Sequence, residues 1–340
     1  MDSVLQLTPR QRGELFTAAA QKSGIDVAVL EKDFWVCWTL KELFGLPVLG
    51  RHLIFKGGTS LSKVFKIINR FSEDIDVSMD RGFLGYGGAN EPEAGASNKE
   101  KQRRVEALAA ACRHKIATEL MPALNSSIQT KISRADHWSL RHDESDPDKQ
   151  TLLFVYPSSV PPTESSYVRR AVKIELGARG DHWPCETRPV TPYVAEQFPQ
   201  GFRQAACEVK VLSVERTFWE KGTILHAEFH RPENKPSPLR LSRHYCDFYE
   251  LIRKGMANRA ADQLELLQRV VEHKSLFFKS SWAKYGEAAK GTLRVAPPAH
   301  RMTTLRADYI NMREMFFGEP PEFEIIISSL KQWESEFNHK

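Results

Sequence analysis

The sequence predicts an α+β fold, in which a mixed sheet with flanking helices is followed by a helical domain. Two observations lead to this prediction. Short segments that suit strands occur at 53–55, 74–79, 151–157 and 169–179. Apolar residues at helical spacing flank these segments and dominate from about residue 208 onward. We therefore expect two domains, 1–207 and 208–340.

The composition is that of a soluble globular protein. Of the 340 residues, 41% are hydrophobic and 27% charged, and no apolar run approaches the roughly 20 residues that cross a bilayer. The five cysteines form no C-x-x-C pair, which argues against a cysteine zinc site. The N-terminus lacks a secretory signal, so we expect a cytoplasmic protein with no membrane partner. The formal charge of +5 is compatible with a nucleic-acid or nucleotide partner but does not establish one.

The elements before residue 180 follow from the spacing of apolar residues. Helices are expected at 9–22 and 26–45, the second ending at Gly45 and Pro47. The strand at 53–55 leads into a glycine pair and then a helix that reaches residue 71. Its apolar face is expected to comprise Leu61, Val64, Phe65 and Ile68.

The rest of the chain alternates loops and helices. A loop rich in glycine and alanine is expected at 81–98, and a helix follows it with a strongly charged start. The helical region after residue 208 is interrupted near 231–238 and 294–300, where prolines gather.

The first candidate site residues are two aspartates on a predicted strand. Asp74 and Asp76 leave the strand from one face, whereas Ile75 and Val77 point to the other. Two carboxylates held this close repel each other, and a divalent cation with oxygen ligands, such as Mg²⁺, relieves that repulsion. When the pair is considered alone, an acidic strand facing water is the better explanation.

A glycine-rich turn precedes these aspartates. Gly57, Gly58, Thr59 and Ser60 lead into a helix, so their backbone N–H groups suit a phosphate group. The two hydroxyls and Lys63 could reach the same anion. A tight turn followed by an ordinary helix cap is the structural alternative. The Walker pattern is absent.

A third carboxylate completes the candidate metal site. Glu175 shares one face of the strand at 169–179 with Lys173, and a neighbouring strand could bring it beside Asp74 and Asp76. Three carboxylates opposite a phosphate-binding turn are typical of two-metal phosphoryl transfer.

Several motifs together resemble the AbiEii/AbiGii toxin family, within the polymerase-beta-like nucleotidyltransferase superfamily. The first is FKGGTSLSK with RFSEDID, preceded by a helix at 31–44. KIEL resembles the strand that carries the third acid, and the segments at 211–226 and 242–251 resemble two later motifs. Cys246 departs from the pattern, because an aromatic residue often precedes the final aspartate there.

The resemblance implies a polymerase-beta-like core with a helical C-terminal domain. It also implies a bacterial toxin that transfers a nucleotidyl group from an NTP, with two Mg²⁺ ions, to an acceptor such as the 3′ end of tRNA. A cognate antitoxin is then a further partner. The matching positions comprise Gly57, Gly58, Thr59, Ser60, Asp74, Asp76, Glu175, Lys221 and Asp247.

The last two residues also have roles on physical grounds. Lys221 lies on a predicted helix with a buried stripe at Val214, Phe218 and Leu225, where an ammonium could hold a triphosphate. Without the motif, a lysine that faces solvent on an amphipathic helix is the better explanation. Asp247 could orient that lysine or act as a general base. Alternatively, it is a buried ion-pair partner of Arg243 or Lys221.

Other signals are weaker. His226 and His230 have the spacing of a helical zinc pair, but Ala227 stands where the metalloprotease pattern requires glutamate. The basic cluster of Lys99, Lys101, Arg103 and Arg104 is better explained as a solvated helix face, and Arg169, Arg170 and Lys173 are better placed to contact an acceptor. Two other functions remain open: phosphoryl transfer by a kinase-like reaction, and an inactive protein that only binds a partner.

Overall fold

The chain divides into two compact units in the computed structural model, which describes residues 1–133, 136–161 and 169–339. The first unit comprises Met1–Val64 and Phe71–Val211, and the second comprises Phe65–Arg70 and the chain from Leu212. The boundary expected at 207/208 falls inside a strand, because Val211 still pairs with Phe55 in the sheet. The segment 65–70 was expected in the first domain and lies in the second unit instead.

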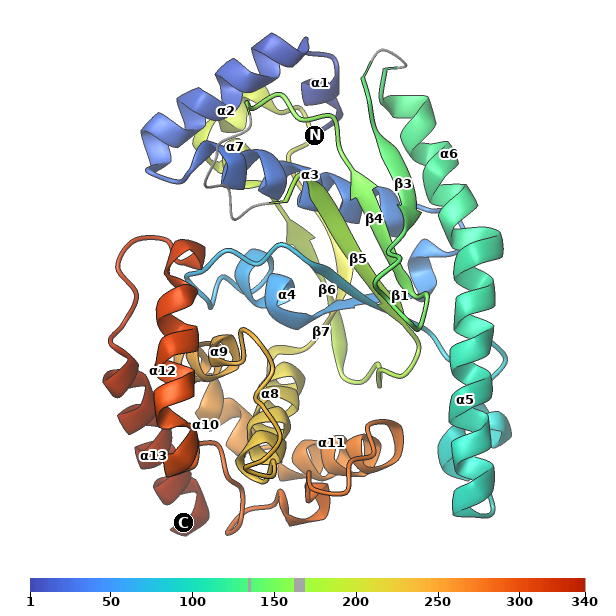
Figure 1. Cartoon of the computed structure of the whole chain (residues 1–340). Coiled ribbons are helices and arrows are strands. Elements are labelled where there is room, and N and C mark those ends of the chain that lie inside the picture. Colours follow the sequence, from blue (N-terminus) through green and yellow to red (C-terminus); the bar gives the residue numbers. More distant parts are fainter. Residues whose placement is uncertain (134–135, 162–168, 340) are drawn as a thin grey trace. The chain divides into compact units, whose positions relative to one another are not determined.

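The first unit is built on a mixed seven-stranded sheet with helices packed around it (Figure 1). The strand order is β3-β4-β5-β2-β1-β7-β6. The central strand β2 runs antiparallel to β1 and parallel to β5. The bounds are β1 (Leu53–Lys56), β2 (Ile75–Met79), β3 (Ser139–His142), β4 (Thr151–Val155), β5 (Ala171–Gly177), β6 (Cys185–Val190) and β7 (Cys207–Leu212).

The four strands expected from the sequence are confirmed as β1, β2, β4 and β5, whereas β3, β6 and β7 were missed. Strands β3 and β6 are the two edges of the sheet and carry several exposed polar residues. Because an edge strand needs little apolar surface, these segments lack the alternation that identifies a strand in a sequence.

Helix α3 forms the centre of the first unit. Its N-terminus is capped by Asp26, which accepts a hydrogen bond from Ala28 N (2.8 Å). Trp35 and Trp38 pack on Phe154 of β4, with ring centroids 5.9 Å apart in both pairs. The helices of this unit are α1 (Asp2–Leu5), α2 (Pro9–Ser23), α3 (Val27–Phe44), α4 (Gly57–Lys63), α5 (Asn98–Lys115), α6 (Met121–Lys131) and α7 (Tyr193–Gln197), with a π-helical turn (Ile116–Leu120) between α5 and α6.

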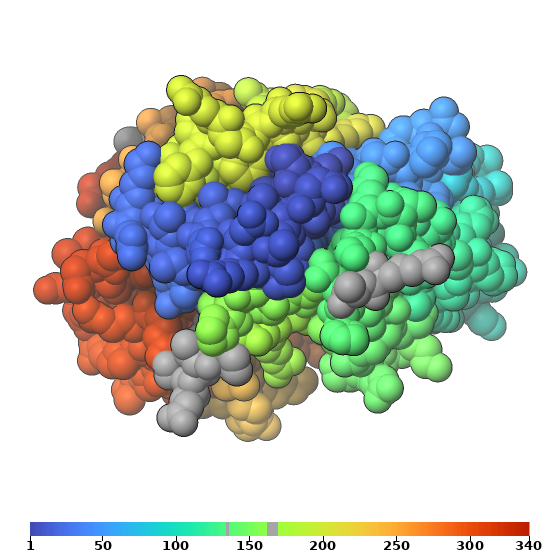
Figure 2. All heavy atoms as spheres, turned by 90° about the horizontal axis from the view of Figure 1, so that it is seen from above, coloured from blue at the N-terminus to red at the C-terminus, as the bar shows by residue number. Residues whose placement is uncertain are grey.

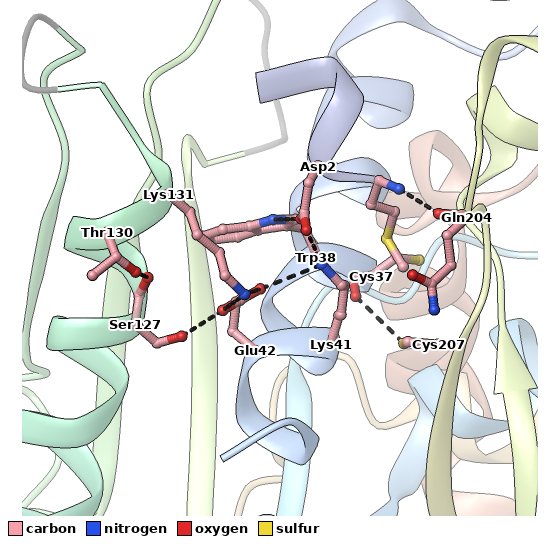
Figure 3. A network of polar contacts seen from close by, with 11 residues as sticks. Asp2, Cys37, Trp38, Lys41, Glu42, Ser127, Thr130, Lys131, Gln204 and Cys207 are labelled. Atoms are coloured by element: carbon pink, nitrogen blue, oxygen red, sulfur yellow. Dashed lines mark hydrogen bonds and ion pairs between the residues drawn. The ribbon is translucent and has the colours of Figure 1, made fainter. Parts of the chain in front are cut away.

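Burial of α3 extends to its charged residues, so each of them needs a partner. Figure 3 shows how Glu42 is satisfied: it accepts hydrogen bonds from Ser127 Oγ (2.6 Å) and Lys131 Nζ (2.7 Å) on α6. On the adjoining side, Asp2 of α1 accepts a hydrogen bond from Trp38 Nε1 (3.2 Å). These contacts fix α1 and α6 against α3.

The N-terminal helices also lie along α7 and the loop that follows it (Figure 2). Lys22 at the end of α2 donates a hydrogen bond to the carbonyl of Gln197 (2.6 Å). The N-terminal ammonium of Met1 donates to the carbonyl of Gln204. Helix α2 itself begins with a capping box, in which Thr8 and Gln11 satisfy each other's backbone N–H groups.

The helix expected to reach residue 71 ends much earlier, so that prediction was wrong. Helix α4 spans Gly57–Lys63, and Lys66 adopts a left-handed backbone conformation with φ of 52°. A left-handed residue cannot continue a right-handed helix. The chain beyond it enters the second unit, where Arg70 forms an isolated β-bridge with Phe316.

The second unit is helical, as the sequence predicted. Its helices are α8 (Val214–Phe229), α9 (Ser242–Arg253), α10 (Met256–Ala261), α11 (Leu264–Phe277), α12 (Met302–Asn311) and α13 (Phe323–His339). Phe218 stacks on Phe248 with centroids 4.5 Å apart, and Trp333 closes the cluster. The interruptions expected near 231–238 and 294–300 separate α8 from α9 and precede α12. In the described parts of the chain, no helix is both long and apolar enough to cross a membrane.

Candidate active site

The glycine pair lies where β1 passes directly into α4. Gly57 is the first residue of that helix and has a φ of 82°, which favours glycine. A Cβ atom at this position would lie only 2.0 Å from Oδ2 of Asp76. Gly57 therefore allows the Asp76 carboxylate to lie directly against the backbone of the turn.

Asp76 and Glu175 meet on neighbouring parallel strands. The register of β2 and β5 places them as direct partners, which leaves their side chains on the same face of the sheet. The two carboxyl groups are close enough for each to shift the pKa of the other. Burial raises the pKa of Asp76, and the neighbouring Glu175 charge raises it further. The structure thus brings together two of the three carboxylates expected to hold a metal.

Asp74 lies one residue before β2 begins. Burial raises its pKa, as do the charges of Glu73 and Glu175. Asp74 is therefore within electrostatic reach of the other two acids. Among the residues that the structure describes, however, no group of three or more His, Cys, Asp or Glu side chains is arranged to hold a metal ion. The expected three-carboxylate set is not preformed.

Two lysines border the carboxylate pair. Lys173 forms an ion pair with Glu175 (2.5 Å), and although burial opposes it, this contact lowers the pKa of Glu175. Lys56 lies opposite Asp76 in the register of β1 and β2, and its charge partly offsets the effect of burial on Asp76. Lys56 was not singled out in the sequence, although it directly precedes the glycine pair.

Three of the expected phosphate ligands have other partners. The Thr59 hydroxyl donates a hydrogen bond to the carbonyl of Asp74 (2.5 Å), and the Ser60 hydroxyl donates to the carbonyl of Gly57 (2.8 Å). Both side chains are fully buried. Their hydroxyls therefore hold the turn and the start of β2 together, and the expectation that they donate to phosphate does not fit the structure.

Lys63 is also a structural residue, contrary to the expectation that it binds an anion. It forms an ion pair with Asp33 of α3 (2.7 Å), and both side chains are only 2% exposed. Its ammonium lies 3.2 Å from the ring centroid of Tyr193, whose backbone N–H donates to the same aspartate. The aromatic ring supports the buried ion pair, and the burial of Lys63 removes its ammonium from the surface where a ligand would bind.

The second unit holds the remaining pair, Lys221 on α8 and Asp247 on α9. The ammonium of Lys221 lies 2.7 Å from Oδ2 of Asp247. Arg70 binds the same carboxylate through two hydrogen bonds, Nε to Oδ1 and Nη2 to Oδ2, each 2.8 Å long. The aspartate is 1% exposed, and although burial opposes it, these two cations hold its pKa far below the usual range. A carboxylate so stabilised in its charged form is a poor general base, so the contacts favour the structural alternative.

Residues 38–334 match the family described as "Nucleotidyl transferase AbiEii toxin, Type IV TA system". The chain belongs to this family. It is therefore a nucleotidyltransferase, and a toxin of a type IV toxin–antitoxin system. Its fold is similar to that of MenT4, a nucleotidyltransferase toxin from Mycobacterium tuberculosis H37Rv, with a TM-score of 0.51 and 15% identity over 98% of this chain and 90% of that one. No curated protein shows significant similarity to the sequence.

The family match spans both units of this nucleotidyltransferase. It includes the glycine turn, the paired carboxylates of the sheet and the Lys221–Asp247 pair. Two residues that hold these groups in place were missed in the sequence. Arg70 lies in the RFSEDID motif, but its partner is 177 positions away. Asp33 lies within a helix whose burial could be inferred, yet its pairing with Lys63 could not.

Substitution of Gly57 by alanine is expected to lower nucleotidyl transfer at least tenfold. The added Cβ would displace the Asp76 carboxylate from its place beside the turn, and the left-handed φ adds backbone strain. Gly85 is the matched control, because its φ is 86° and a Cβ there would meet nothing within 4 Å. The transfer rate of Gly85→Ala should therefore report the effect of backbone strain without any displacement of a side chain. Equal transfer rates for the two variants would contradict the role given to Gly57.

The discounted signals have structural explanations in the nucleotidyltransferase. His226 is buried, its Nδ1 accepts a hydrogen bond from Arg294 N (3.0 Å), and its Nε2 lies 3.2 Å from the carbonyl of Lys284. Both ring nitrogens are thus engaged within the fold. In the basic cluster, Arg104 forms an ion pair with Glu100 one turn earlier on α5. This pairing fits a solvated helix face.

Proposed function

We propose that this toxin transfers a nucleoside monophosphate from an NTP to an RNA hydroxyl, with tRNA as the acceptor, and depends on Mg²⁺. The observation that carries the proposal is the pairing of Asp76 with Glu175 against the Gly57 backbone. A carboxylate pair beside a partly exposed glycine turn suits a site that handles a metal-bound polyphosphate. A cognate antitoxin and a cytoplasmic location are part of the same proposal.

The paired acids fit a divalent cation. Two carboxylates that face each other in a partly buried site favour a shared proton or a cation between them, and hard oxygen donors suit Mg²⁺. Asp76 and Glu175 would hold Mg²⁺, Asp74 would join them once the ion is bound, and two ions are expected. When bound, Mg²⁺ neutralises charge on the reacting phosphates.

In the proposed reaction, the acceptor oxygen forms a bond to the α-phosphorus of the NTP. The bond from that phosphorus to the oxygen bridging to the β-phosphate breaks, and pyrophosphate leaves with the electron pair. The hydroxyl proton passes to solvent. The backbone N–H groups of Gly57 and Gly58 bind phosphate oxygens.

The test uses NTPs labelled at either the α- or the γ-phosphate, incubated with the enzyme, Mg²⁺ and total tRNA. We expect the α-label to enter RNA, and we expect EDTA to abolish incorporation until excess Mg²⁺ is added. Entry of the γ-label would instead indicate kinase-like phosphoryl transfer. Label found in protein would overturn the RNA acceptor, and incorporation that persists in EDTA would overturn the metal requirement.

A further inference from the structure

A cavity of about 270 Å³ lies within the second unit. Its lining includes Arg70, Phe316 and four residues of α9, which are Asp247, Tyr249, Glu250 and Arg253. Its size suits a ligand as small as a single base, since pockets for drug-sized ligands begin at roughly 300 Å³. None of the roles described above uses this cavity.

The walls of the cavity are held in place before any ligand arrives. Arg70 forms a β-bridge with Phe316, and Phe317 N donates a hydrogen bond to the carbonyl of Asn69 (3.2 Å). The side chain of Asn69 adds a second bond, from Nδ2 to the carbonyl of Phe317 (2.9 Å). The ring of Tyr309 packs edge-on against Phe316, with centroids 5.6 Å apart. A preformed wall reduces the entropic cost of binding.

The cavity combines aromatic surface with groups that recognise polar edges. Tyr249 and Phe316 both line the cavity and are partly exposed, so aromatic surface is available to a planar ligand. Glu250 receives two hydrogen bonds from Arg253 on Oε2 (3.0 and 2.7 Å). Within the described residues, Glu250 Oε1 and Arg253 Nη1 make no hydrogen bond, so the cavity provides both an acceptor and a donor.

We propose that this cavity binds a nucleobase, which stacks on Tyr249 or Phe316 and is recognised at its edge by Glu250 and Arg253. The inference rests on the proposed function, because a nucleotidyltransferase with an RNA acceptor meets bases from two sources. One is the NTP, and the other is the terminal nucleotide of the acceptor. Aromatic side chains beside an arginine are the usual equipment for an unpaired base.

Binding measurements on the full-length protein test the proposal. Phe316→Leu and Tyr249→Leu keep apolar volume but remove a ring, and Phe278→Leu is the control, because Phe278 is a 40% exposed aromatic outside the cavity. Calorimetric titration with each of the four NTPs in Mg²⁺, and separately with tRNA, gives the two affinities. At least one of the two cavity variants should have an affinity for NTP or for tRNA that is about 5- to 150-fold weaker, which is the range for loss of one base–aromatic stack. Phe278→Leu should leave both affinities unchanged.

The two titrations distinguish the source of the base. Weaker NTP binding with unchanged tRNA binding assigns the cavity to the NTP, and the reverse assigns it to the acceptor. Unchanged affinities in both titrations would overturn the proposal. If Phe316→Leu does not fold, Arg253→Met replaces it, because that side chain is half-exposed and should be tolerated. Because binding is measured without turnover, a wild type that binds bases here but transfers no nucleotide would refute the proposed reaction alone.

Discussion

Asp76→Asn is expected to lower the rate of nucleotidyl transfer by more than about 100-fold. Substitution of a residue that only supports a metal ligand lowers metal affinity or activity by roughly 10- to 100-fold, and loss of a ligand should have a larger effect. The substitution keeps the size of the side chain but removes the charge that faces Glu175 and borders Gly57. Transfer of α-labelled NMP to tRNA, measured over a range of Mg²⁺ concentrations, is the readout. A rate restored by excess Mg²⁺ would place the defect in metal affinity.

The same variant should remain folded. The neutral amide that replaces the Asp76 carboxylate cannot repel Glu175, so we expect a melting temperature equal to or above that of the wild type. Glu119→Gln is the control, because Glu119 is a half-exposed carboxylate just beyond the end of α5 whose partner is Lys115. Its transfer rate should not change. An Asp76→Asn enzyme with normal activity would refute the assignment of Asp76 to the reacting centre.

Asp247→Asn is expected to reduce the free energy of unfolding by about 3–5 kcal/mol at pH 7, as the loss of one partner from a buried ion pair does. The change leaves Arg70 and Lys221 buried together without their shared counterion. Urea unfolding measures the difference. Glu319→Gln removes one end of an exposed ion pair with Arg313 and should have little effect.

The stability lost in Asp247→Asn should depend on pH. The pKa of Asp247 in the folded protein lies below its value in the unfolded chain, so its contribution is fully present above about pH 4, where an unfolded aspartate is charged. That contribution declines as the pH falls further. Wild type and variant should therefore converge in stability under acidic conditions. A difference that stays constant down to about pH 2.5 would contradict the assignment.

The parts of the site that the sequence predicted are those governed by local periodicity. Successive residues of a strand point to opposite faces, so Asp74 and Asp76 share one face and Ile75 lies on the other. This assignment does not depend on the tertiary structure. The same rule applies to Glu175, and the structure pairs it with Asp76 across β2 and β5. The glycine turn was recognised as well, although the helix begins at Gly57 itself.

The residues that were misjudged depend on partners distant in sequence. Lys63 lies one turn into a helix, and from the sequence alone it could bind an anion. In the structure it forms an ion pair with Asp33 of another helix. The apolar spacing of 61–68 predicts a helix, but the left-handed Lys66 ends it, and Arg70 finds Asp247 far along the chain. The edge strands β3 and β6 could not be predicted, because their polar sequences resemble those of loops.

Residues 65–70 belong to the second unit although the chain around them belongs to the first. A single cut in the sequence therefore cannot separate the two units. A fragment that starts at Leu212 would lack Arg70, so the carboxylate of Asp247 would keep only one of the two cations that bind it. A fragment that stops at Val211 would carry Ile67 and Ile68, both buried in the intact protein, without the helices of their own unit. Any recombination that exchanges the helical half between relatives must therefore carry this short insert with it.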